Sequence, residues 1–206
     1  MISVTQPTRT SDSRAVFLQA FQEFKVGHYA SCVDDLLKLS DAGDAKASYI
    51  LAVIFDKGGN GVTQDIQRAK ELYALSLQQS PIPGAGIALA QILCAGRGGT
   101  TDFAAAKRYC DMFPYTGYAV VMLGLMKYHG SGCPKDYDAA LLLFDRAWSL
   151  GHPLGLKYAA IVRMSKREYF RASSDFIRSA LLIVWYYGIR KYPLTKSPRD
   201  KVSTIL

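Results

Sequence analysis

The sequence predicts an all-α fold built from stacked helical hairpins. Two observations lead to this prediction: a segment with a fixed order of residue types occurs three times, and apolar side chains follow at helical spacing in every copy. With 206 residues, of which 50% are hydrophobic and 20% charged, the chain can bury a continuous core. This composition excludes a disordered or collagen-like polypeptide.

The first 43 residues precede the repeated segments. We expect residues 1–13 to be flexible and residues 14–43 to form a capping helical hairpin that turns around Gly27. Terminal units of a repeat array are usually atypical, because one of their faces is exposed to solvent.

The repeated segments begin at Leu51, Leu89 and Leu123. In each copy a small residue follows the leucine, and a glycine-rich loop and an aspartate come next. The aspartates are Asp65, Asp102 and Asp136, and an alanine lies four residues after each of them, at Ala69, Ala106 and Ala140.

This order has a physical explanation. Glycines adopt the left-handed backbone that a tight reversal needs. An aspartate at a helix start accepts hydrogen bonds from free backbone N–H groups and lies at the positive end of the helix dipole. Small residues let two antiparallel helices approach closely. Each copy is therefore predicted to be a helix, a glycine turn and a second helix, and such units must stack to bury their apolar faces.

The segment from Gly130 to His152 resembles the Sel1-like repeat. The resemblance covers about residues 44–165, which we take as the repeat array, and it departs from the family pattern at Lys127, Cys133 and Ala139. It implies an α/α superhelix, or solenoid, related to tetratricopeptide repeats. The implied function is that of a non-catalytic scaffold for macromolecular assembly.

By the same analogy, the first helix of each hairpin lines a concave groove, where a partner protein would bind. The candidate groove residues lie near the leading leucine of each copy and near the corresponding position of a fourth, irregular copy that follows the third. For each of them, the sequence leaves open whether it contacts a partner or packs between repeats. They are Tyr49, Val53, Asp56, Ile87, Gln91, Tyr118, Val121, Leu125, Tyr128, Lys157, Ile161 and Met164.

The end of the chain differs in charge from the remainder. The formal net charge is +8, and all of this excess lies in residues 157–206. We expect residues 166–192 to form a capping helix, with an apolar run over 176–189, and residues 193–206 to be a basic flexible tail. The candidate basic surface is Arg163, Lys166, Arg167, Arg171, Arg190 and Lys191. It could dock an acidic partner or simply be a solvated terminus.

No motif for chemistry is evident in the sequence. The glycine loop at 96–101 lacks the lysine of a phosphate-binding loop, and the cysteines and histidines do not have metal-ligand spacing. We expect no catalysis, cofactor or metal. The sequence has no apolar stretch long enough to span a bilayer and no secretory signal, which predicts a cytoplasmic protein with reduced thiols.

These observations favour a scaffold or adaptor that binds another protein, with acidic character in the partner. One alternative is an immunity or regulatory protein that blocks one cognate effector. An alternative of a different class is binding of nucleic acid, or peripheral binding of an anionic membrane, through residues 157–206.

Overall fold

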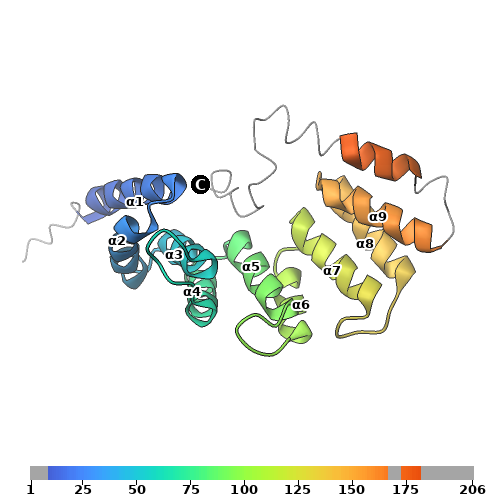
Figure 1. Ribbon diagram of the computed structural model, residues 1–206, viewed down its shortest axis with the longest axis horizontal. Coiled ribbons are helices and arrows are strands. Elements are labelled where there is room, and N and C mark those ends of the chain that lie inside the picture. Colours follow the sequence, from blue (N-terminus) through green and yellow to red (C-terminus); the bar gives the residue numbers. More distant parts are fainter. Residues whose placement is uncertain (1–8, 167–172, 182–206) are drawn as a thin grey trace, which may run out of the picture. The chain divides into compact units, whose positions relative to one another are not determined.

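The computed structural model describes residues 9–166 and 173–181, and within these ranges the regular secondary structure is entirely helical (Figure 1). The helices confirm the predicted all-α class. The helices are α1 (Arg9–Val26), α2 (Tyr29–Asp41), α3 (Ala45–Lys57), α4 (Ile66–Gln79), α5 (Pro83–Cys94), α6 (Phe103–Asp111), α7 (Gly117–His129), α8 (Tyr137–Ser149) and α9 (Pro153–Ser165), and residues 173–181 are also helical. None of the described helices is both long enough and apolar enough to cross a membrane.

The chain divides into two compact units, Met1–Leu89 and Ala90–Leu206. In the first unit, α1 pairs with α2 and α3 pairs with α4, and α2 also packs against α3. The aromatic side chains Phe17, Phe21 and Phe24 of α1 are buried at helical spacing. Their rings stack with centroids 6.1 and 6.3 Å apart, and Phe24 stacks on Tyr29 of α2 at 5.7 Å. The capping hairpin thus has an aromatic core.

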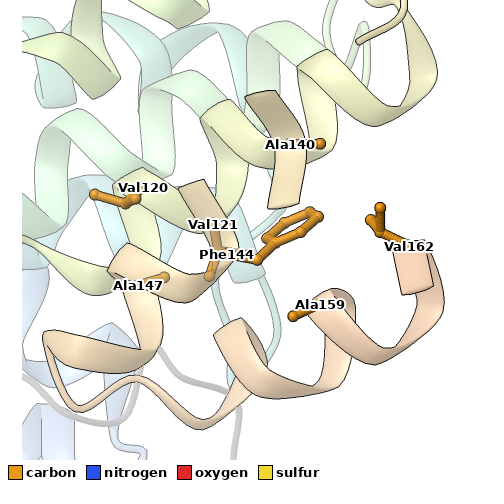
Figure 2. Close-up of a cluster of buried hydrophobic side chains, with 7 residues drawn as sticks. All are labelled: Val120, Val121, Ala140, Phe144, Ala147, Ala159 and Val162. Atoms are coloured by element: carbon orange, nitrogen blue, oxygen red, sulfur yellow. The ribbon is translucent and has the colours of Figure 1, made fainter. Parts of the chain in front are cut away.

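In the second unit α8 packs against both α7 and α9. Their shared core cluster consists of small and branched side chains around one phenylalanine (Figure 2). The cluster residues are Val120, Val121, Ala140, Phe144, Ala147, Ala159 and Val162. The repeated alanine of the third copy, Ala140, is fully buried there, as helical spacing in the sequence predicts.

Two glycines allow this close packing. A Cβ atom on Gly124 of α7 would lie 2.5 Å from the ring of Phe144. A Cβ on Gly155 of α9 would lie 2.5 Å from both the Phe144 carbonyl oxygen and the Trp148 backbone nitrogen. The backbones of α8 and α9 are therefore nearly in direct contact at Gly155.

The three repeated aspartates begin the second helix of each hairpin, as predicted. The side chains of Asp65, Asp102 and Asp136 accept hydrogen bonds from the backbone nitrogens of residues 68, 105 and 139, at 2.9, 2.8 and 2.9 Å. Asp44, which lies outside the repeated pattern, caps α3 in the same way and accepts hydrogen bonds from the nitrogens of residues 46 and 47. Each cap satisfies backbone donors that have no partner inside the helix.

The glycine loops also have the predicted backbone. Gly130, which follows α7, has φ +75° and ψ +32°, the left-handed conformation that commonly ends a helix. Gly58, after α3, has φ +65°.

The two ends of the described chain differ from the predicted boundaries. Helix α1 begins at Arg9, so residues 9–13 are helical although we expected flexibility over 1–13. Of the predicted capping helix, residues 173–181 are helical, with Phe176, Ile177 and Leu181 exposed. Residues 167–172 and 182–192, with the whole predicted tail 193–206, lie outside the described residues.

The four cysteines are free thiols. Burial raises the pKa of Cys32 from its ordinary value of 9.0 to about 11 and that of Cys110 to about 12, and burial also raises the pKa of Cys94. Since the thiolate is the reactive form, Cys32 and Cys110 are expected to be chemically inert at neutral pH.

We predict that Gly155→Ala destabilises the protein by about 1 to 3 kcal/mol, because the new methyl group would collide with the α8 backbone. Helix propensity alone predicts the opposite sign, a stabilisation of about 0.5 to 1 kcal/mol. Urea unfolding followed by circular dichroism distinguishes the two outcomes. Ala104→Gly, at an exposed position of α6, calibrates the propensity term, and an unchanged or higher stability for Gly155→Ala would contradict the close contact.

We predict that Cys32 and Cys110 of the native protein resist alkylation by iodoacetamide at pH 8, and that all four cysteines react in guanidinium chloride. Peptide mass spectrometry measures the label at each site.

The raised pKa values of Cys32 and Cys110 also predict how the free energy of unfolding depends on pH. Above about pH 9 the unfolded thiols ionise while the folded thiols stay protonated, so the free energy of unfolding falls as the pH rises from 9 toward 11. Rapid labelling of Cys32 or Cys110 in the native protein at pH 8 would contradict the first prediction. A free energy of unfolding that stays constant between pH 9 and 11 would contradict the second.

Candidate partner-binding surface

The predicted groove residues of the first unit are mostly inaccessible. The exposed fractions of Tyr49, Val53 and Asp56 are 7%, 1% and 0%. Helix α3 packs against both α2 and α4, and almost all of its side chains are buried. Of the predicted residues in this unit, only Ile87 of α5 is partly exposed. The prediction that Tyr49, Val53 and Asp56 contact a partner is therefore wrong, and packing against neighbouring helices is the reason.

Asp56 shows why a polar residue can lie inside this unit. Its carboxylate accepts a hydrogen bond from the Tyr73 hydroxyl at 3.3 Å, and its backbone carbonyl accepts one from the Gln64 side chain at 2.7 Å. Hydrogen bonding compensates for the removal of these groups from water. Asp56 is a structural residue of the first repeat.

In the second unit most of the predicted residues stay accessible. Val121 is the exception, because it is 1% exposed and belongs to the core cluster. Gln91 is partly exposed on α5. The remaining six residues lie on α7 and α9, two helices in contact, and we call them the α7/α9 surface: Tyr118, Leu125 and Tyr128 of α7, with Lys157, Ile161 and Met164 of α9. Five of these are partly exposed, and Met164 is 51% exposed.

The tyrosines of the α7/α9 surface are held at both ends of α7. The Tyr118 hydroxyl accepts a hydrogen bond from Gln91 Nε2 at 2.6 Å, and its ring packs edge-on against His152, with centroids 5.4 Å apart. Near the other end, the Tyr128 hydroxyl lies 3.4 Å from Ser165 Oγ of α9. These contacts fix the rings before any partner arrives.

The side chains that support these tyrosines are not evident from the sequence. Besides His152 and Ser165, they include Tyr137, whose ring centroid lies 5.4 Å from that of Tyr128. Leu125 and Tyr128 also pack against the core cluster of the unit. The spacing of Tyr118, Leu125 and Tyr128 along one helix signalled a shared face, but nothing in the sequence indicated which distant residues would complete it.

Arg163 is one of the predicted basic surface residues, but its charge is paired within the chain. Its guanidinium lies 3.0 and 3.1 Å from the two carboxylate oxygens of Asp145 of α8, and it also pairs with Asp175 of the 173–181 helix. The Arg163 side chain is only 15% exposed. Because two carboxylates of the chain itself compensate its charge, Arg163 is not a free cation for a partner.

Lys166 also pairs within the chain, with the exposed Asp138 of α8. The other predicted basic residues, Arg167, Arg171, Arg190 and Lys191, lie outside the described residues. In the described chain no group of three histidine, cysteine or acidic side chains is placed to hold a metal ion.

Comparison with known proteins identifies the repeat. The Sel1 repeat family model matches residues 45–80 and 117–152, which contain the hairpins α3/α4 and α7/α8. The chain therefore contains two Sel1 repeats. The second copy, over α5 and α6, lies outside the two matched ranges, and its second helix is the shortest of those named, with 9 residues. No curated protein sequence matches this Sel1-repeat protein.

Two solved structures have the same fold. A protective antigen of uropathogenic Escherichia coli strains, which displays an SLR fold, has 17% identity and a TM-score of 0.73 over 95% of this chain. This Sel1-repeat protein spans 45% of that antigen. A Sel1 repeat protein from Oxalobacter formigenes has 16% identity and a TM-score of 0.63, with 90% of this chain and 79% of the other covered. These similarities confirm the α/α solenoid fold. Sel1-repeat proteins are generally non-catalytic interaction scaffolds.

We predict that Arg163→Met lowers the free energy of unfolding by about 1 to 3 kcal/mol, because it leaves Asp145 and the mostly buried Asp175 without their shared cation. Hydrogen exchange should rise in residues 173–181. Lys107→Met is the matched control, since it breaks an exposed pair with Asp111 and should cost less than about 0.5 kcal/mol. Equal effects of the two substitutions would show that Arg163 has no special role.

Proposed function

We propose that this Sel1-repeat protein is a scaffold that binds a partner protein through the α7/α9 surface. The observation that supports the proposal most directly is the fixed position of Tyr118 and Tyr128, whose rings are partly exposed although their hydroxyl groups are bonded within the unit. Tyrosine is a frequent interface anchor, and a side chain that is already ordered loses little entropy on binding.

The composition of the surface also fits a protein partner. Leu125, Ile161 and Met164 add apolar area beside the tyrosine rings. Interface centres are enriched in aromatic residues and methionine and depleted of charged residues. Methionine adapts its shape to a partner because it is unbranched and flexible.

Lys157 supports an acidic character in the partner. It is partly exposed, and no carboxylate of the described chain lies within ion-pair distance of its ammonium group. Its Nζ lies 5.7 Å from the ring centroid of Tyr158. Together with the excess of positive charge in residues 157–206, Lys157 would favour association with an acidic surface, most strongly at low salt.

We predict that Tyr128→Ala combined with Met164→Glu abolishes capture of a stoichiometric partner in affinity purification from the native cell. The reason is that the double variant removes one ring and places a charge at the exposed end of the surface. Leu142→Glu is the matched control, because Leu142 is 72% exposed on α8 and is not part of the α7/α9 surface. The control should retain the partner.

A partner that is retained by the double variant, or lost equally from the control, would contradict the α7/α9 surface as the binding site. Recovery of nucleic acid or lipid alone would instead favour binding through residues 157–206. Circular dichroism of each variant verifies that the helices persist.

A further inference from the structure

A hollow of about 460 Å³ lies in the first unit, where the turn between α1 and α2 meets the glycine loop that follows α3. Its lining combines four polar side chains with apolar and glycine residues: Glu23, Val26, Gly27, His28, Ala30, Ser31 and Asn60. The volume lies within the range of about 300 to 1,000 Å³ that is typical of small-ligand sites. None of these residues belongs to the α7/α9 surface.

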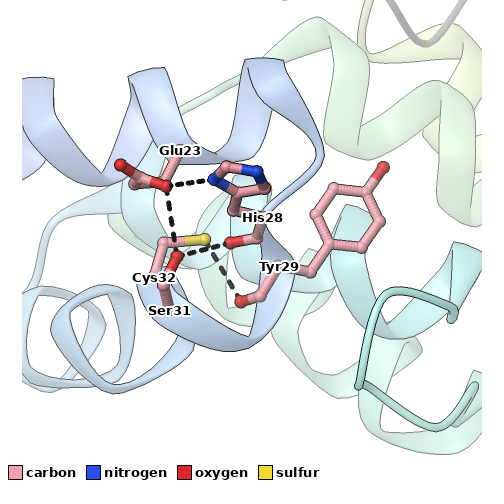
Figure 3. A network of polar contacts seen from close by, with 5 residues as sticks. All are labelled: Glu23, His28, Tyr29, Ser31 and Cys32. Carbon is pink, nitrogen blue, oxygen red and sulfur yellow. Dashed lines mark hydrogen bonds and ion pairs between the residues drawn. The ribbon is translucent and has the colours of Figure 1, made fainter.

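Three of these polar residues, Glu23, His28 and Ser31, form a connected network (Figure 3). His28 Nδ1 lies 2.8 Å from Glu23 Oε2, and Ser31 Oγ lies 3.3 Å from the same carboxylate oxygen and 2.8 Å from the His28 carbonyl oxygen. Because an ionised carboxylate can only accept, the imidazole carries its proton on Nδ1. The Nε2 atom of a neutral His28 is then an acceptor.

This network does not have the geometry of a hydrolytic triad. The Ser31 hydroxyl donates toward Glu23 and the His28 carbonyl, whereas a nucleophilic serine must donate to an imidazole nitrogen. The arrangement instead fixes the Glu23 carboxylate and the His28 ring in place. It provides acceptors, since Glu23 Oε1, His28 Nε2 and the Ser31 lone pairs have capacity for further hydrogen bonds.

The glycine loop after α3 contributes one more polar side chain, that of Asn60, whose backbone conformation is unusual for a residue other than glycine. Asn60 is the only non-glycine residue of the described chain with a positive φ, at +53°. A Cβ on Gly27 would lie 3.2 Å from Asn60 Nδ2, so the amide packs directly over the α1/α2 turn. The amide also has a carbonyl oxygen, which can accept a hydrogen bond.

The charged side chain that lines the hollow is the carboxylate of Glu23. On α1, Lys25 is directed away from Glu23, because its Nζ lies 4.8 Å from the centroid of the Phe21 ring. On α2, Asp35 pairs with Lys38, whereas Asp34 is exposed one turn beyond Ala30 and Ser31. No residue that lines the hollow is a lysine or an arginine. An acceptor-rich hollow that is lined by one carboxylate, with the Val26 and Ala30 side chains beside it, favours a cation with several donors and an apolar stem.

We propose that this hollow, which we call the cap hollow, binds a guanidinium group, carried either by an arginine side chain of a peptide or by a small free guanidine. A guanidinium presents five donors in a plane, and it is more weakly hydrated than an ammonium ion. Glu23 supplies the opposite charge, while His28, Ser31 and Asn60 supply acceptors from the turn, α2 and the loop. The Val26 side chain, which is 69% exposed, is available to cover the stem.

NMR titration of the full-length ¹⁵N-labelled protein tests the proposal. The probes are an alanine pentapeptide with a central arginine, free arginine amide, and the same pentapeptide with citrulline or lysine at its centre. We expect the arginine pentapeptide to shift the amide signals of Gly27, Ser31 and Asn60. Comparison with arginine amide tells whether the peptide backbone contributes. The uncharged citrulline peptide should bind at least about tenfold more weakly, since it keeps the shape and loses the charge.

Three variants localise the binding. Glu23→Gln should weaken it about tenfold, and Asn60→Gly should weaken it a few-fold while it preserves the positive φ of the loop. Glu71→Gln is the matched control, because it removes the same charge from an exposed position on α4 and should leave affinity unchanged. The proposal is overturned if citrulline or lysine binds as well as arginine, if Glu71→Gln weakens binding as much as Glu23→Gln, or if the cap-hollow signals do not shift.

Discussion

The second unit depends on how closely α8 is approached by its two neighbours. Gly124 of α7 faces the ring of Phe144, and Gly155 of α9 faces the backbone of the same residue. A side chain at either glycine would push the helices apart, and Phe144 would lose its contacts with Val121, Ala159 and the other members of the cluster. The contact between α7 and α9, and with it the α7/α9 surface, follows from this spacing.

Local chemistry was the part of the fold that could be predicted. The Asp136 cap and the left-handed Gly130 depend only on residues a few positions away, so the sequence contains all the necessary information. The same holds for the buried stripe of α8, because helical periodicity alone places Ala140, Phe144 and Ala147 on one face.

Exposure of the candidate site could not be predicted in the same way. Alignment of the copies treats Val53 of the first repeat and Leu125 of the third as comparable groove positions, yet Val53 is buried and Leu125 is partly exposed. The difference arises because α2 of the capping hairpin and α4 both pack on α3. Arg163 was misjudged for a related reason. Its partners Asp145 and Asp175 lie on two other helices, and a count of charges along the chain does not reveal such pairing.

Every substantial contact between the described helices joins neighbours or next-but-one neighbours in the chain, as with α7 and α8 or α7 and α9. Within residues 9–166, no printed helix pairing has to wait for a segment that is distant in the sequence. The helices of this part of the chain can therefore pair soon after they leave the ribosome, and the entropy lost in closing each loop is small. An architecture of this kind is expected to fold rapidly and to tolerate the gain or loss of whole hairpins during evolution.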